Sequence, residues 1–230
     1  MTFSLVGRCA RTGKLGLVVA SSSPAVAARC AWARGRVGAV ATQNVTDPSL
    51  APQVLDLMEL GRSATDALSE VVARAPFTEY RQLAVIDAAG RTASYSGART
   101  LGRHSSRAGK DCLAAGNILA DVKVTEAMVQ AFELHPQDYL ADRLLDALRA
   151  GAAAGGEEGP VHSCGLLVVD QVTWPVTDLR VDWHDDPITE LARLWAVWRP
   201  QEAAYVQRAL DPTARTELRG PGRRVTPRQR

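Results

Sequence analysis

The sequence lacks a long apolar stretch, which limits where the protein is expected to work. No run approaches the roughly 18 apolar residues that mark a membrane-spanning helix, so we expect no transmembrane segment and no membrane partner. The N-terminal residues Met-Thr-Phe-Ser-Leu-Val-Gly-Arg also lack the basic region and the long apolar region of a secretory signal peptide. These absences predict a soluble, cytoplasmic protein.

A strong charge of one sign is missing as well. The 27 Lys and Arg residues nearly balance the 25 Asp and Glu residues, which gives a formal net charge of +2, and part of this excess falls in the C-terminal tail. Because the rest of the chain is close to neutral, it gives no reason to expect nucleic acid as a partner.

Cysteine and histidine are few and scattered, whereas a structural zinc site needs clustered ligands. We therefore expect no metal, and we expect the cysteines to be reduced thiols in the core. A P-loop, a GxGxxG turn and a nucleophile elbow are also absent, so no cofactor is expected. The cysteines are Cys9, Cys30, Cys112 and Cys164, and the histidines are His104, His135, His162 and His184.

The composition that remains is ordinary for a globular domain. The 230 residues are 46% hydrophobic and 23% charged, which is enough apolar material for a sizeable core. No repeat or linker divides the chain, so residues 1–211 are predicted to form a single domain. Residues 212–230 are rich in Arg, Pro and Thr and predict a disordered basic tail.

The predicted elements are hairpins that alternate with pairs of helices. Strands are expected from alternating or short apolar runs, and helices from amphipathic spacing with caps such as Asp47-Pro48 and Ser63. This order favours an α+β protein with stacked antiparallel sheets and outer helices, rather than a parallel sheet. Predicted strands span 2–9, 15–20, 26–32, 37–43, 82–87, 91–96, 111–117, 164–169 and 179–183. Predicted helices span 50–60, 64–74, 124–133, 138–149 and 186–210, and the Gly-rich residues 150–160 are expected to be flexible.

Thr2 is the first candidate for chemistry. Methionine aminopeptidase generally removes Met1 before a small residue, which leaves Thr2 with the free α-amine. An α-amine titrates near pH ~7.7–8.0, so it can act as a base that takes the proton of the threonine hydroxyl. An N-terminal threonine thus carries nucleophile and base on one residue. The alternative is that Thr2 is only a common second residue.

Ser21, Asn117 and His104 are the other candidates. Ser21 ends the second predicted strand, and in a tight hairpin that end lies near Thr2. Asn117 follows a short strand after Gly116, where its amide and backbone N–H groups can form an oxyanion hole. His104 lies among arginines in a predicted polar loop and suits an anionic substrate or proton transfer. An ordinary turn, or a solvated loop, is the alternative for each.

Several short blocks together make the chain resemble DUF1028, a family assigned to the N-terminal-nucleophile hydrolases. The resemblance covers about residues 2–210 and implies a four-layer αββα sandwich with Thr2 as the nucleophile. It also implies that only Met1 has to be removed. The blocks are Thr2-Phe3-Ser4-Leu5-Val6, Gly13-Lys14-Leu15-Gly16, Arg36-Val37-Gly38-Ala39-Val40-Ala41-Thr42-Gln43, Tyr80-Arg81-Gln82-Leu83, Gly116-Asn117-Ile118-Leu119 and Asp178-Leu179-Arg180-Val181-Asp182.

The chain departs from the family pattern near the expected site. Ser22-Ser23-Pro24 replaces an Arg and aromatic residues, Ala27 replaces a Gly, and Gly159-Pro160-Val161-His162-Ser163 replaces an Arg-containing segment. Arg29 is a candidate to supply one of the missing charges, and Arg29, Gln43 and His104 are the candidate substrate-binding residues. These departures put the specificity, or the activity itself, in doubt.

Three functions remain open at this point. The first is an amidohydrolase that uses Thr2 on a small amide substrate and self-associates, as its superfamily commonly does, most simply as a homodimer. The second is a non-catalytic binding or assembly protein on the same fold. The third is an unrelated enzyme with a cysteine nucleophile, Cys30 or Cys164, which rapid thiol labelling would reveal.

Overall fold

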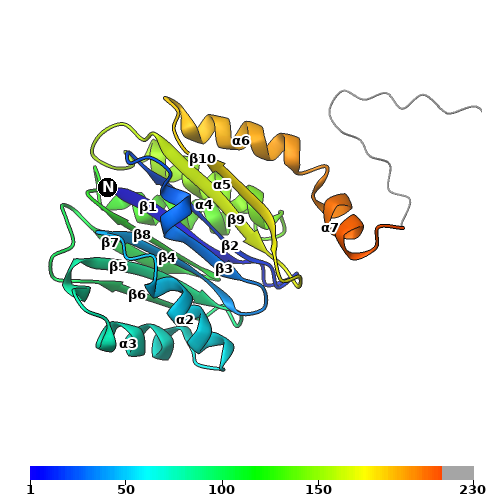
Figure 1. Cartoon of the computed structure of the whole chain (residues 1–230). Helices are drawn as coiled ribbons and strands as arrows, with labels where there is room; N and C mark the ends of the chain where they lie inside the picture. Colours follow the sequence, from blue (N-terminus) through cyan, green and yellow to red (C-terminus); the bar gives the residue numbers. More distant parts are fainter. Residues whose placement is uncertain (214–230) are drawn as a thin grey trace, which may run out of the picture.

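The structure is a computed structural model that describes residues 1–213 of the chain. From residue 214 on, the predicted disordered tail lies outside the described residues. Two antiparallel sheets stack face to face, and helices cover both outer faces (Figure 1). This arrangement is the four-layer α+β sandwich that was expected. None of the helices within residues 1–213 combines the length and the apolar character of a membrane span.

The larger sheet has six strands in the order β10–β9–β2–β1–β8–β7, and every neighbouring pair is antiparallel. The first strand of the chain therefore lies in the interior of this sheet, between strands that come from distant parts of the sequence. The strands are β1 (Thr2–Arg8), β2 (Leu15–Ser21), β7 (Ser105–Gly109), β8 (Cys112–Asn117), β9 (Ser163–Val169) and β10 (Pro175–Val181).

The smaller sheet has four strands in the order β3–β4–β5–β6, also antiparallel. Its strands are β3 (Ala31–Arg34), β4 (Gly38–Asn44), β5 (Arg81–Asp87) and β6 (Thr92–Ser96). Small and aliphatic side chains fill the space between the two sheets and form a buried cluster. This cluster consists of Val6, Leu15, Leu17, Ala39, Ala41, Ala84, Ile86, Leu113, Ala115, Leu167 and Val169.

Helices cover the outer face of each sheet. On the larger sheet, α4 (Lys123–Leu134), α5 (Leu140–Ala153) and α6 (Pro187–Trp198) bury a cluster that includes Phe3 and Leu5. On the smaller sheet, α2 (Leu50–Glu59) and α3 (Ala64–Arg74) pack on Val40 and Leu83. Because strand side chains alternate between faces, Phe3 and Leu5 point to the helices while Ser4 and Val6 point to the other sheet. Thr2 belongs to this inner row.

Three predicted elements differ from the structure. Residues 26–32, expected to be one strand, form the short helix α1 (Val26–Cys30) followed by β3. Ala25 adopts a left-handed φ of 52°, which turns the chain, and the buried Val26, Ala27 and Cys30 then form one helical face against Val19. The expected loop after His104 instead contains the edge strand β7, whose polar side chains give no apolar alternation.

The predicted C-terminal helix is divided in two. Helix α6 ends at Trp198 and α7 (Glu202–Leu210) begins three residues after Arg199. Pro200 lies in the break, where its missing N–H cannot continue the helical hydrogen bonds. The break lets α7 turn toward the end of the sheet where β2 begins.

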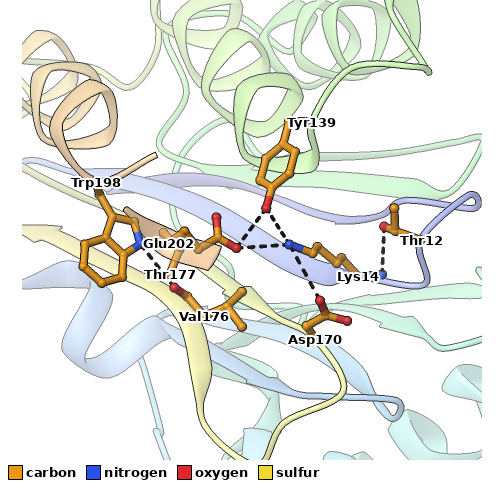
Figure 2. A network of polar contacts seen from close by, with 8 residues as sticks. All are labelled: Thr12, Lys14, Tyr139, Asp170, Val176, Thr177, Trp198 and Glu202. Carbon is orange, nitrogen blue, oxygen red and sulfur yellow. Dashed lines mark hydrogen bonds and ion pairs between the residues drawn. The ribbon is translucent and has the colours of Figure 1, made fainter. Parts of the chain in front are cut away.

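A charged network fixes α7 to the rest of the protein (Figure 2). Lys14, at the start of β2, donates to the Tyr139 hydroxyl at 2.5 Å and lies 3.0 Å from Glu202 Oε1 of α7. The Tyr139 hydroxyl in turn donates to Glu202 at 2.9 Å, and Asp170 lies 3.7 Å from the Lys14 ammonium. Glu202 is buried and receives both hydrogen bonds at Oε1, while its Oε2 has no partner among residues 1–213. The Lys14 ammonium and the Tyr139 hydroxyl thus replace only part of the hydration that the carboxylate loses.

Candidate active site

Thr2 lies at the end of the large sheet between Ser21 and Asn117. Asn117 pairs directly with Thr2 across β1 and β8, and the pairing of Phe3 with Ala20 places Ser21 beside Thr2 on the other side. Residues paired across antiparallel strands project to the same face. The structure therefore brings the three predicted catalytic residues into one row on the inner face, with Thr2 only 4% exposed and the other two fully buried.

The Met1 carbonyl occupies the centre of this row. The Thr2 hydroxyl donates to the Met1 oxygen, and the Ser21 hydroxyl donates to the same oxygen at 2.5 Å. While Met1 is present, both hydroxyl groups are thus engaged by the peptide bond that precedes Thr2. The atom that would become the free amine of Thr2 is part of that same peptide.

Ser21 also begins a chain of polar contacts that ends at Arg29. Its hydroxyl lies 2.8 Å from that of Ser23, and the Ser23 N–H donates to Ser21 Oγ at 3.1 Å. The Arg29 guanidinium donates to Ser23 Oγ at 3.3 Å and to the Pro24 carbonyl at 2.8 Å. Among residues 1–213, Arg29 forms no ion pair, so a half-buried cation lies two contacts away from Ser21.

A buried amide network sets the orientation of Asn117. Asn117 Nδ2 donates to Gln82 Oε1 at 3.1 Å, and Gln43 Nε2 donates to the same oxygen at 2.8 Å. The Gln82 amide nitrogen donates to the Gly116 carbonyl at 3.0 Å, while Ser4 donates to Gln43 Oε1 at 2.8 Å. These bonds fix which end of each amide is nitrogen. Asn117 Oδ1 is buried and has no partner among residues 1–213, and one N–H of the Asn117 amide donates to Gln82.

Gln43 and His104 take different positions relative to this row. Gln43 uses both ends of its amide inside the protein and is fully buried, so its contacts hold the two sheets together and help to orient Asn117. His104 is exposed beside the edge strand β7, and its Nδ1 lies 3.2 Å from the Gly102 carbonyl. Strand β8 separates His104 from β1, so the structure does not bring it to Thr2. Their roles in substrate binding stay predictions.

Glu157 is a site residue that the sequence did not indicate. It lies in the Gly-rich connection that was expected to be flexible, yet it is only 2% exposed and accepts the Ser22 N–H at 2.5 Å. Its second oxygen is buried without a partner among residues 1–213. Burial raises the pKa of the Glu157 carboxyl, although the Ser22 contacts and the nearby N-terminal charge act in the opposite direction. Its neighbour Glu158 is exposed and pairs with Arg103 at 2.6 Å.

Aromatic side chains lie next to the row on the side of β9. The backbone N–H of His162 donates to the Ser21 carbonyl at 2.9 Å. The His162 ring stacks on Trp183 with 4.3 Å between ring centres. Trp183 is largely exposed. The serine-rich turn that follows Ser21 thus lies between a buried carboxyl group and a stacked aromatic pair.

The protein is thus an α+β sandwich of two stacked sheets. Its first strand and the two neighbouring strands carry a row of polar side chains at one end of the space between the sheets. The chain belongs to the DUF1028 family, a family of unknown function whose sequence model matches residues 2–191. The crystal structure of protein SPO2555 from Silicibacter pomeroyi, matched to the same family, is 28% identical over 90% of both chains, with a TM-score of 0.82.

More distant structures also align with the chain. Anbu (ancestral beta-subunit) from Yersinia bercovieri is 11% identical, with a TM-score of 0.39 over 89% of this chain and 97% of that one. An Anbu (Gly-1) mutant from Hyphomicrobium sp. strain MC1 is 11% identical, with a TM-score of 0.43 over 90% and 97% of the two chains. Among curated proteins, none matches the chain significantly.

Proposed function

We propose that this protein is an amidohydrolase whose nucleophile is the hydroxyl of Thr2, exposed by removal of Met1. The observation that carries the proposal is the row Ser21–Thr2–Asn117, in which the Met1 carbonyl takes both hydroxyl hydrogen bonds. Cleavage after Met1 would remove that carbonyl, free both hydroxyls and leave an amine on Thr2. This is the chemistry of the N-terminal-nucleophile hydrolases, which the sequence resembles.

The reaction would proceed in two halves. The Thr2 amine takes the hydroxyl proton, and Thr2 Oγ1 bonds to the amide carbon of the substrate. An N–H of Asn117 stabilises the oxyanion that forms. The C–N bond then breaks as the ammonium returns its proton to the leaving nitrogen, and water hydrolyses the ester on Thr2. Ser21 would orient the amine or relay the proton.

A small amide that carries a carboxylate suits the surroundings of Thr2. Arg29 is a half-buried cation without an ion-pair partner in residues 1–213, and a guanidinium binds carboxylates in a bidentate manner. Glu157 accepts the Ser22 N–H and would hold the serine-rich turn in place beside Thr2. The proposed substrate class is therefore an acylated or carbamoylated amino compound.

Mass spectrometry of the intact protein tests the proposal directly. Purified protein that has lost Met1 is treated with a β-lactone, and the expected result is a single adduct on Thr2. Thr2→Ser should keep the adduct, while Thr2→Val, which has the same shape without the hydroxyl, should lose it. Protein made under inhibition of methionine aminopeptidase is the matched control, since it retains Thr2 but blocks its amine.

A free Thr2 that never reacts would contradict the proposal. The same holds if Met1 stays on the protein in the cell, because the hydroxyl groups then remain bonded to its carbonyl. Either result would favour the alternative, a binding or assembly protein that has this fold without catalysis.

A further inference from the structure

A buried arginine lies at the end of the large sheet that is remote from Thr2. Arg143, in the first turns of α5, is only 5% exposed. Its Nε donates to the Phe132 carbonyl at 3.0 Å, and its guanidinium lies over the Phe132 ring at 3.9 Å from the ring centre. These contacts hold the plane of the guanidinium in one orientation.

Arg143 forms no ion pair within residues 1–213, although the more distant charges of Asp111 and Asp138 act on it. Its two terminal nitrogens make no hydrogen bond to a described residue. The terminal nitrogens are also not among the enclosed side-chain nitrogens without a partner, so they reach solvent. Burying a cation without a carboxylate is costly, and burial accordingly lowers the pKa of Arg143.

Arg143 lines a cavity of about 310 Å³ formed by three connections of the chain. The β1–β2 turn contributes Ala10 and Arg11, and the β7–β8 turn contributes Lys110 and Asp111. Glu133 and Pro136, from the end of α4 and the link to α5, complete the wall. The volume lies at the lower end of the range for small-molecule sites.

Both carboxylates that line the cavity accept hydrogen bonds from the protein, whereas the cations that line it form no ion pair among residues 1–213. Asp111 accepts from Arg8 at 2.7 Å, and Glu133 accepts the Lys110 backbone N–H at 2.5 Å. Arg11 donates to the Gln137 carbonyl at 3.2 Å, and among residues 1–213 neither Arg11 nor the Lys110 ammonium has an ion-pair partner. The lining thus contains three cations (Arg11, Lys110 and Arg143) and two carboxylates that already accept hydrogen bonds.

We propose that this cavity binds a small molecule through a carboxylate or phosphate group held by Arg143. The two free terminal nitrogens of a fixed guanidinium match two oxygens of such a group, which is the geometry that favours Arg over Lys. Arg11 and Lys110 add positive charge at the rim. Ala10 and Pro136 provide an apolar wall for the rest of the ligand. This site is independent of the chemistry at Thr2.

Nuclear magnetic resonance on the full, ¹⁵N-labelled chain tests the proposal with inorganic phosphate and acetate as probes, at constant ionic strength set with chloride. Binding should give saturable shifts of the amides of Ala10, Lys110 and Arg143, without matching shifts of the amides of Phe3 and Asn117 beside Thr2. Arg143→Lys, which keeps the charge but loses the fork, should weaken binding by about tenfold or more.

A second variant keeps the test decisive if Arg143→Lys fails to fold. Arg11→Ser with Lys110→Ser changes only cations at the rim and should weaken binding by about tenfold. Arg107→Ser with Lys123→Ser removes the same charge from exposed positions outside the cavity and should leave binding unchanged. Shifts that do not saturate, that chloride reproduces, or that both double variants reduce equally would overturn the proposal.

Discussion

Asn117 stands directly opposite Thr2 in the antiparallel pairing of β8 with β1. The distance between their side chains is therefore set by the register of two buried strands and does not depend on a flexible loop. The Gln82 amide, which bonds to Asn117 Nδ2, restrains the side chain further. Such a rigid arrangement is what a group must have to stabilise charge that develops during a reaction.

Replacing Asn117 by Ala should slow the reaction of Thr2 with a β-lactone by about 10²–10³-fold, the effect typical of losing one oxyanion donor. The rate of adduct formation in intact-mass measurements checks this. Ser96→Ala is the matched control, since Ser96 bonds to the same Gln82 from the exposed side and should change the rate little. An Asn117→Ala protein that folds and reacts at the normal rate would remove Asn117 from the mechanism.

Glu157 should make the free energy of unfolding depend on pH. Its pKa in the folded protein lies above the ordinary value of 4.5, so its contribution to stability is fully present below pH 4.5 and is lost as the pH rises through the folded pKa. Glu157→Gln should therefore gain stability relative to the natural protein over that rise, as urea unfolding at several pH values would show. Glu158→Gln, the same change at the exposed neighbour, is the matched control. A gain that appears on lowering the pH would mean that folding lowers the pKa of Glu157 instead of raising it.

The network of Lys14 and Glu202 should contribute strongly to stability (Figure 2). Lys14→Met leaves the buried Glu202 carboxylate without its cation and should lower the free energy of unfolding by about 3–5 kcal/mol. Arg74→Met breaks an exposed pair with Glu70 and should cost less than about 1 kcal/mol. Urea denaturation of both variants makes the comparison. Equal losses in the free energy of unfolding would mean that the buried Lys14–Glu202 pair stabilises the protein no more than the exposed Arg74–Glu70 pair does.

Three of the four buried thiols, those of Cys30, Cys112 and Cys164, should be unreactive at neutral pH. Burial raises the pKa of Cys112 and of Cys164 to about 12, and it also raises the pKa of Cys30, so the thiolate fraction at pH 7.5 is very small. Iodoacetamide should label these positions only after denaturation. Rapid labelling of Cys30 or Cys164 in the folded protein would instead revive a cysteine nucleophile.

Much of the fold followed from local patterns in the sequence. The hairpin of β1 and β2 and the helix α3 with its Ser63 cap were predicted correctly, because alternation and capping act over a few residues. The order of the elements also predicted stacked antiparallel sheets with outer helices, and the family resemblance implied the four layers. Helix α1 was missed because it depends on the left-handed Ala25, and β7 because a polar edge strand shows no apolar period.

The candidate site was predictable where strand pairing alone brings residues together. The hairpin predicted that Ser21 lies near Thr2, whereas the pairing of Asn117 with Thr2 across β8 and β1 is visible only in the structure. Glu157 was not predictable, because its burial arises from a bridge between residues 119 and 157 and from the distant Ser22 turn. Its sequence neighbourhood gives the same acidic, Gly-rich signal for the exposed Glu158.

The position of β1 also sets an order of events during synthesis. β1 is synthesised well before its partner β8, so one edge of β1 stays unpaired until residues 112–117 have been made. Once the sheet closes, the Met1 carbonyl is held by Thr2 and Ser21. The proposed removal of Met1 would therefore be easiest before β8 joins the sheet, and a polypeptide that folded first would keep the Met1 carbonyl bonded to both hydroxyl groups.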